Sequence, residues 1–241
     1  MSNNYGPKIV TDGLVLCLDA ADQNSYSGSG NTWYDLSGNG NNGTLTNGPT
    51  FSNGNGGSIA FDGSNDSVVN TYTSNFHMDT NSTIEVIFKC NSSLTNSTDS
   101  RQSLFSNSTS ISFGLEIGIF SGCNIDSTTG FRFLMHRQGS CFSAVSAANA
   151  WVQSEICFFT YTRDASRGEK MFVNGQEITP QQANGYPYSA GSSSSFFGIR
   201  QGTGGGQRLN GNIYKTSIYS KALTPQEIQQ NYNATKGRFG L

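Results

Sequence analysis

The chain has 241 residues and a formal net charge of −2, and only 12% of its residues are charged. Ordinary globular domains carry about 25% charged residues, so polarity here comes mainly from Gly, Ser, Asn and Thr. The Lys and Arg residues are scattered singly, without the basic cluster that a nucleic-acid binder needs. No apolar run approaches the ~20 residues of a membrane span. These features exclude direct nucleic-acid binding and membrane insertion.

Aromatic residues are numerous enough to fill a large core. Sixteen Phe, ten Tyr and two Trp are spread through the chain, whereas disordered chains are poor in aromatics. Because all-β domains routinely reach ~200 to 250 residues, we expect one domain over residues 1–241, with an N-terminal arm at 1–12 and a short helix and tail at 224–241. The start, MSNNYGPK, lacks the regions of a secretory signal, so we expect no export by a signal peptide.

Three apolar segments near the N-terminus predict short strands. They are GLVLCLDA, TWYDLSGNGNNGTL and GGSIAFDGSNDSV, and Gly, Asn and Asp separate their apolar runs. Gly and Asn readily adopt the positive φ angles of tight turns. Residues 13–69 are therefore predicted to form strands joined by tight turns.

An alternating pattern of side chains predicts a longer strand in the middle of the chain. In STIEVIFK, Ile84, Val86 and Phe88 alternate with the residues between them, which is typical of a strand with one face on the core. Similar runs predict strands at 113–120, 131–136 and 155–162.

Residues 90–110 are rich in Ser, Asn and Thr. We expect a long surface loop here, because loops on a rigid sandwich often carry specificity. A solvated spacer is the alternative interpretation.

The last part of the chain predicts a hairpin, two strands and one helix. Asn174 and Gly175 lie between two strand-like arms, and this dipeptide favours a type I′ turn. Strands follow at 196–200 and 212–219. Thr224, Pro225 and Glu227 form a helix start with a capping box, and the helix is predicted at about 225–233.

The chain resembles the laminin-G-like, concanavalin A-like jelly rolls, especially those found in virion proteins of tailed phages. The resemblance is carried by residues 8–70, the FVNGQ segment and GNIYKTSIYSKALTPQEIQQNYN. The resemblance implies an all-β, two-sheet antiparallel jelly-roll sandwich with one short C-terminal helix. The strand pattern alone also favours an antiparallel two-sheet sandwich.

A search for catalytic motifs finds none. The two His residues lie outside any GxSxG, HExxH or Cys/His signature. No closely spaced carboxylates match the pair that jelly-roll glucanases use. Glu85 and Glu116 each stand alone on a strand and are expected to face solvent. We therefore expect a protein that is not an enzyme.

The resemblance also implies a possible structural Ca²⁺, since many laminin-G-like jelly rolls hold this ion. The corresponding segments offer Asp19, Asp35, Asp62 and Asp66, and carboxylates are suitable Ca²⁺ ligands. Relatives that bind the ion often have an acidic residue where this chain has Tyr214. The alternative is that the aspartates cap turns through hydrogen bonds to the backbone.

Glycan binding needs an exposed aromatic side chain beside amides and hydroxyls. Tyr186, Tyr188 and Trp151 are the ligand-binding candidates, and the YPY segment has the composition of an exposed loop. The alternative for Trp151 is that it opens a strand. Trp33 and Tyr34 belong to a segment shared across the family and are expected to be structural.

The resemblance implies a non-enzymatic accessory protein of a virion, either a capsid decoration or a tail- or fibre-associated knob. Its expected partners are other capsid or tail proteins and a host surface glycan, with homo-oligomerisation left open. It would be made in the host cytoplasm and lie on the virion surface. The alternatives are a free carbohydrate-binding adhesin and a polysaccharide-active enzyme with a degenerate motif.

Overall fold

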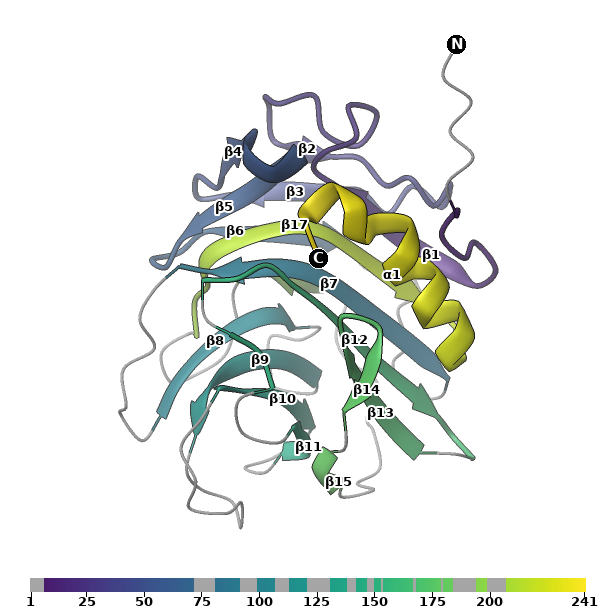
Figure 1. Cartoon of the computed structure of the whole chain (residues 1–241). Coiled ribbons are helices and arrows are strands. Elements are labelled where there is room, and N and C mark those ends of the chain that lie inside the picture. The colour runs from purple at the N-terminus through teal and green to yellow at the C-terminus, as the bar shows by residue number, and fades with distance from the viewer. Residues whose placement is uncertain are drawn as a thin grey trace.

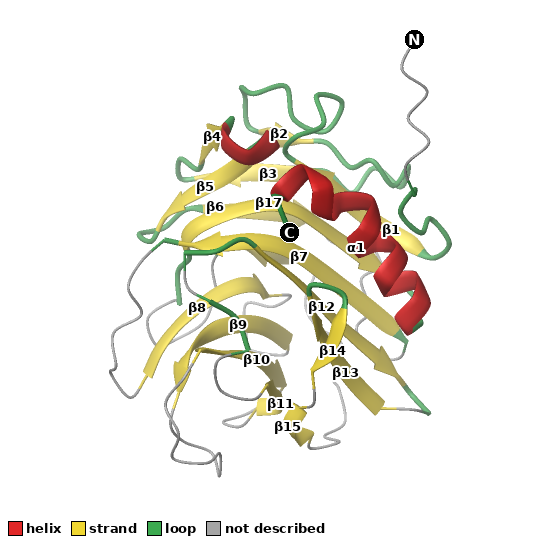
Figure 2. Cartoon of the chain, in the orientation of Figure 1, coloured by secondary structure: helices red, strands yellow, loops and turns green. Residues whose placement is uncertain are grey.

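The computed structural model shows two antiparallel sheets and a C-terminal helix (Figures 1 and 2). The structure describes residues 7–71, 81–91, 99–106, 113–120, 131–137, 142–146, 150–152, 154–166, 168–178, 180–183, 194–198 and 207–241. Tyr186 and Tyr188 lie outside these residues.

The first sheet, sheet A, has the strand order β14-β13-β12-β7-β17-β5-β4, and β1 also pairs with β17. Its strands are β1 (Leu14–Asp19), β4 (Thr50–Ser52), β5 (Ser58–Asp62), β7 (Ser82–Cys90), β12 (Cys157–Asp164), β13 (Gly168–Val173), β14 (Gln176–Ile178) and β17 (Asn210–Tyr219).

The second sheet, sheet B, has the order β15-β11-β10-β9-β8-β16-β6-β3-β2. Its strands are β2 (Thr32–Trp33), β3 (Gly43–Thr46), β6 (Ser67–Thr71), β8 (Asp99–Ser106), β9 (Phe113–Phe120), β10 (Phe131–Arg137), β11 (Phe142–Ser146), β15 (Pro180–Ala183) and β16 (Ser194–Phe197). A 3₁₀ turn, η1 (Gly54–Gly56), and helix α1 (Pro225–Phe239) complete the described elements. The predicted two-sheet antiparallel sandwich with a C-terminal helix is confirmed.

The main core lies between the two sheets. Ile84, Val86 and Phe88 of β7 all point into it, as their alternation predicted. Phe133 of β10 stacks on Phe159 of β12 with ring centroids 3.8 Å apart, so aromatic side chains join the two sheets.

The predicted hairpin is confirmed and also contacts the helix. Asn174 and Gly175 have φ angles of 49° and 76°, as the turn between β13 and β14 requires. A Cβ atom on Gly175 would lie only 3.0 Å from the ring of Tyr232. Glycine therefore serves both the turn and the close approach of α1.

The prediction of one long loop at 90–110 is wrong for its centre, because β8 lies there. Leu104 and Phe105 are fully buried in the core, and the Phe105 and Phe197 rings are 5.1 Å apart. The surrounding serines obscured this strand, although Ser103 and Ser106 are themselves buried.

Helix α1 begins as predicted and ends later. Thr224 accepts a hydrogen bond from the backbone N–H of Glu227, and the Glu227 side chain bonds back to complete the capping box. The helix continues to Phe239, where Gly240 in the left-handed conformation ends it, so the predicted end at residue 233 is wrong. No helix in the described part of the chain is long and apolar enough to cross a membrane.

Helix α1 lies across sheet A, over β1, β17 and β7 (Figure 1). A bulge in β17 separates Ile213 from Lys215 in the register with β7. Tyr214 packs against Phe239 of the helix with ring centroids 5.4 Å apart, and Lys215 lies opposite Asp19 of β1. The bulge therefore supplies two successive side chains to the face beneath α1.

Candidate functional site

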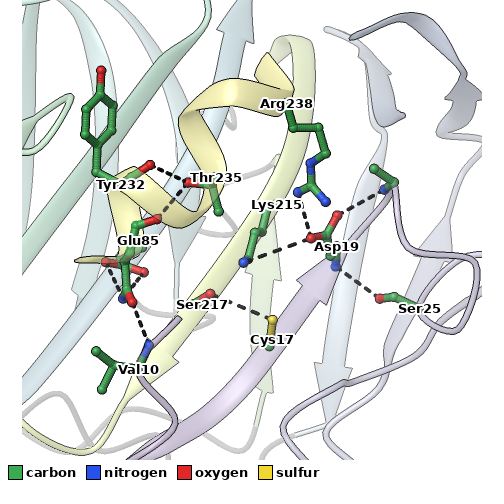
Figure 3. Close-up of polar contacts among 12 residues, drawn as sticks. Val10, Cys17, Asp19, Ser25, Glu85, Lys215, Ser217, Tyr232, Thr235 and Arg238 are labelled. Carbon is green, nitrogen blue, oxygen red and sulfur yellow. Dashed lines mark hydrogen bonds and ion pairs between the residues drawn. The ribbon is translucent and has the colours of Figure 1, made fainter. Parts of the chain in front are cut away.

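Charged and amide side chains gather between α1 and sheet A (Figure 3). We call Asp19, Glu85, Lys215, Asn231 and Arg238 the helix-interface cluster. The first three come from β1, β7 and β17, and the last two come from α1. All except Arg238 are buried, so their charges and hydrogen bonds must be satisfied mainly by one another.

Glu85 is a fully buried carboxylate with only 4% of its surface exposed. The Nδ2 atom of Asn231 lies 3.0 Å from each of its carboxylate oxygens. Burial raises the pKa of Glu85 to about 7, and the hydrogen bond from Asn231 and the charge of Lys215 offset only part of this effect. The prediction that Glu85 faces solvent is wrong, because α1 covers it.

Asn231 joins several segments through one amide group. Its Nδ2 also lies 2.9 Å from the Tyr219 hydroxyl, and its Oδ1 accepts a hydrogen bond from the backbone N–H of Val10 at 2.7 Å. The Tyr219 hydroxyl donates to the Val10 carbonyl at 3.1 Å. Burial raises the pKa of Tyr219 well above its usual value, which keeps this hydroxyl protonated. Asn231 therefore ties the N-terminal segment to α1, β7 and β17.

A cavity of about 10 Å³ lies beside this network. Glu85, Lys215, Ser217 and Asn231 are among its polar lining residues. Such a volume has room for about one water molecule and is far too small for a sugar. The helix-interface cluster therefore acts by holding α1 and the N-terminal segment on sheet A.

The loop between β2 and β3 presents apolar side chains to solvent. Tyr34 and Leu36 are 52% and 38% exposed, whereas the neighbouring Trp33 is completely buried. The backbone of Tyr34 is fixed on both sides by Ser25, whose carbonyl accepts from Tyr34 N at 2.7 Å and whose hydroxyl donates to Tyr34 O at 2.6 Å. The expectation of a structural role is confirmed for Trp33, but the Tyr34 side chain is exposed.

Asp35 holds this loop in place. Its Oδ1 accepts hydrogen bonds from the backbone N–H groups of Cys17 and Ser37, both at 2.9 Å. Its Oδ2 accepts from the Ser37 hydroxyl at 2.6 Å and from Asn41 N at 3.0 Å. Four donors to one carboxylate fix the loop against β1, so Tyr34 is presented on a rigid support.

A groove of about 220 Å³ lies between the β12–β13 hairpin and the start of α1. Leu223 and Pro225 contribute apolar surface, and Asp164 and Lys170 contribute charged groups. Lys170 is paired with Glu177 at 2.9 Å. The groove is a second candidate place for a small ligand, and its accessible lining is mainly apolar.

Trp151, a predicted ligand-binding residue, lies in the core with only 4% exposed. Its ring centroid is 5.8 Å from that of Phe88 and 6.4 Å from that of Phe133. Because Trp151 packs among core rings, it offers no stacking surface to a glycan. Trp151 was a ligand-binding candidate because it follows the loop-like segment SAANA, and the residue types of that segment do not show that the Trp151 ring is buried.

The four predicted calcium ligands lie in three separate structural settings. Asp19 belongs to the helix-interface cluster, Asp35 anchors the β2–β3 loop, and Asp62 and Asp66 occupy the β5–β6 turn. Asp62 accepts from Ser64 N at 2.7 Å, and Asp66 accepts from Asp62 N at 3.0 Å. Among the described residues, no group of three or more His, Cys, Asp or Glu side chains could hold a metal ion. These residues do not fit a calcium site and instead fit the turn-capping alternative.

Sequence reasoning missed Glu85, Asn231, Lys215 and Arg238 as interacting residues. A partial signal was present in α1, where residues three or four positions apart, about one helical turn, form a buried row. This row consists of Ile228, Asn231, Thr235 and Phe239. A buried stripe on a helix that includes Asn indicates a polar partner on the surface that the helix covers.

Comparisons with known proteins agree with this architecture. The sequence family described as the Concanavalin A-like lectin/glucanases superfamily matches residues 61–229. Curated proteins give no significant match by sequence.

Several solved structures share the fold. The botulinum neurotoxin serotype D binding domain has a TM-score of 0.64 at 17% identity, covering 94% of this chain and 53% of that chain. The serotype D ligand binding domain in complex with N-acetylneuraminic acid has the same TM-score at 16% identity, covering 94% and 52%. Trypanosoma rangeli sialidase in complex with sialic acid has a TM-score of 0.61 at 14% identity, covering 94% and 33%.

This chain thus spans about half the length of the toxin domains and a third of the sialidase. At these identities the likeness establishes the fold alone. Because the family match extends from β5 into α1, the chain belongs to the concanavalin A-like lectin and glucanase superfamily.

Proposed function

We propose that this chain is a non-enzymatic glycan-binding module of a virion surface, a capsid decoration or a tail- or fibre-associated knob that aids attachment to the host. The observation that carries glycan binding is the exposed Tyr34 ring on a loop fixed by Asp35. Tyrosine supplies a large apolar contact at low conformational cost, and a rigid loop lowers the entropy lost on binding.

The composition of the loop supports a sugar as the ligand. Asn39 and Asn42 are exposed beside Tyr34 and Leu36 in the same short segment. Binding sites for small polar molecules combine apolar surface with a few positioned hydrogen-bonding groups. Asn39 Nδ2 donates to Leu14 O at 3.0 Å and Asn42 Oδ1 accepts from Asp35 N at 2.9 Å. The loop therefore offers the aromatic ring for the carbon face of a sugar, and Asn39 Oδ1 and Asn42 Nδ2 for its hydroxyls.

The virion setting is supported by the sequence resemblance to modules of tailed-phage structural proteins. The non-enzymatic role is supported by the small cavity beside Glu85, since a volume of about 10 Å³ has room for about one water molecule and cannot hold a glycan. In this proposal, contacts with capsid or tail proteins anchor the module and the Tyr34 loop faces outward.

Glycan binding is tested with a panel of bacterial polysaccharides and sialylated glycans, because structures with the same fold were crystallised with sialic acid. Tyr34→Ala should weaken binding roughly five- to 150-fold without changing Tm, taking as a guide the about 1–3 kcal/mol that a nucleobase gains by stacking on an aromatic side chain. Val152→Ala removes another exposed apolar side chain, 56% exposed, and should leave binding unchanged. Loss of binding in Lys170→Ala, with Tyr34→Ala unaffected, would instead place the ligand in the groove beside β13.

The virion setting is tested by mass spectrometry of purified particles. Copy numbers similar to that of the major capsid protein support capsid decoration, and a few copies per particle support a tail or fibre position. Absence from the particles, together with glycan binding, would favour a free adhesin.

A further inference from the structure

The carboxylate of Asp19 faces two positive side chains. Asp19 and Lys215 are directly opposite in the β1–β17 register, and Lys215 Nζ lies 4.0 Å from Asp19 Oδ2. The Arg238 Nη2 atom lies 2.7 Å from the same oxygen (Figure 3). Asp19 and Lys215 are buried, which limits screening of their interaction by solvent, whereas the Arg238 side chain is 35% exposed and meets Asp19 from the edge of the interface.

The other oxygen of Asp19 is also used. Oδ1 accepts a hydrogen bond from Ala21 N at 3.1 Å, and the Asp19 backbone N–H donates to the Ser25 hydroxyl at 3.0 Å. A Ca²⁺ ion needs six to eight oxygen ligands at about 2.3–2.6 Å. At Asp19 such an ion would displace a guanidinium and lie near an ammonium group of the same charge sign.

The path of Arg238 to Asp19 depends on a nearby glycine. Gly56 of η1 has φ of 88°, and a Cβ atom there would lie 3.2 Å from Arg238 Cγ. Arg238 is also in the last turn of α1, where a positive charge interacts favourably with the helix dipole. Three features therefore favour a guanidinium at this place: the carboxylate, the space over Gly56 and the helix end.

From this geometry we infer that Arg238 and Lys215 supply the positive charge at Asp19 that calcium would supply, so folding of this module does not depend on calcium. Helix α1 carries one of these cations and is thereby fastened to β1. Asp35 agrees with the inference, because its four hydrogen bonds from the protein already engage both carboxylate oxygens. The inference is independent of glycan binding.

The experiment compares Tm of the full chain after EDTA dialysis with Tm in millimolar CaCl₂. Equal Tm values are expected. A calcium site at a hundredfold excess of ion over Kd would raise Tm by roughly 5–10 °C, and a rise of that size would overturn the inference. Calorimetric titration of CaCl₂ into the dialysed wild-type protein tests the same inference without any variant: no binding heat is expected, and saturable calcium binding would overturn it.

A double-mutant cycle tests the role of Arg238. Asp19→Asn and Arg238→Gln should each lower Tm by a few degrees, and the double variant should be no less stable than the worse single variant, because both changes remove one interaction. Fully additive losses would show that the two side chains act separately and would overturn the inference. Arg238→Lys is the matched variant; it keeps the charge without the planar guanidinium, and should retain part of the stability.

Discussion

The two faces of β7 pack against the rest of the molecule in different ways. Toward sheet B, Ile84, Val86 and Phe88 join a core of aliphatic and aromatic side chains. Toward α1, Glu85 is held by Asn231, and Ile87 packs beside Tyr214 and Phe239. The inner interface is almost wholly apolar, whereas the outer one combines apolar contacts with a buried polar network.

This difference separates two sources of stability. The free energy gained by burying apolar side chains is roughly proportional to the buried area and does not depend on the direction of individual contacts. A buried hydrogen-bond network depends on the position and protonation of individual groups, and a single unsatisfied group is costly. The inner interface should therefore tolerate changes of pH, and the outer interface should respond to them.

The largest expected effect comes from opening the inner interface. Phe159→Ala removes a fully buried ring that stacks on Phe133 at 3.8 Å. We expect a loss of about 3–5 kcal/mol in the free energy of unfolding, equal at mildly acidic and mildly alkaline pH. Urea unfolding followed by circular dichroism at both pH values measures it.

Val152→Ala is the control for this change, because Val152 is exposed and should alter stability by less than about 0.5 kcal/mol. If the stability lost in Phe159→Ala depended strongly on pH, the inner interface would also respond to pH. That result would contradict the proposed difference between the inner and outer interfaces of sheet A.

The next effect concerns the outer interface and pH. Because burial raises the folded-state pKa of Glu85 from an ordinary 4.5 to about 7, the native state binds its proton more tightly than the unfolded state. The resulting stabilisation is fully present below about pH 4.5 and is lost as pH rises through about 7. A tenfold change in proton affinity is worth about 1.4 kcal/mol, so the loss is on the order of 3 kcal/mol.

Glu85→Gln should remove this decline and leave the variant more stable than the wild type at alkaline pH. Denaturant unfolding across a pH series measures both curves. Glu177→Gln, at an exposed carboxylate paired with Lys170, is the matched control and should keep the wild-type decline. A wild-type curve that is flat between about pH 5 and pH 8 would contradict the assignment of Glu85.

The same contrast explains how much of the fold could be predicted. Alternation in β7 and the Asn174–Gly175 turn are local patterns, and both were read correctly. Burial of Glu85 depends on Asn231, 146 residues further along the chain, so no local pattern indicates it. The strand at β8 was missed because Ser and Gln surround its two large core residues, and only pairing with β9 and β16 shows that the segment belongs to sheet B.

The candidate site was harder to predict than the fold. Asp35 was chosen as a metal ligand, but three of its four donors are backbone N–H groups of its own loop and of β1, which residue types do not reveal. Trp33 and Tyr34 were treated alike because they belong to one segment, but β2 ends at Trp33 and only the Trp33 side chain is buried. The exposure of Tyr34 therefore required the fold, and so did the pairing of Arg238 with Asp19, because 219 residues separate them.

The smallest effect concerns the start of α1, where a local interaction holds the helix independently of the buried network. Thr224→Ala removes the acceptor for Glu227 N and should cost about 1 kcal/mol, whereas Thr224→Ser keeps a hydroxyl there and should cost less. Because Thr224 makes no contact with Glu85, the wild-type dependence of stability on pH should remain in the alanine variant, as measured by the same unfolding series. Loss of that dependence would show that a weakened cap releases α1 from Glu85, and that the polar network does not hold the helix without the cap.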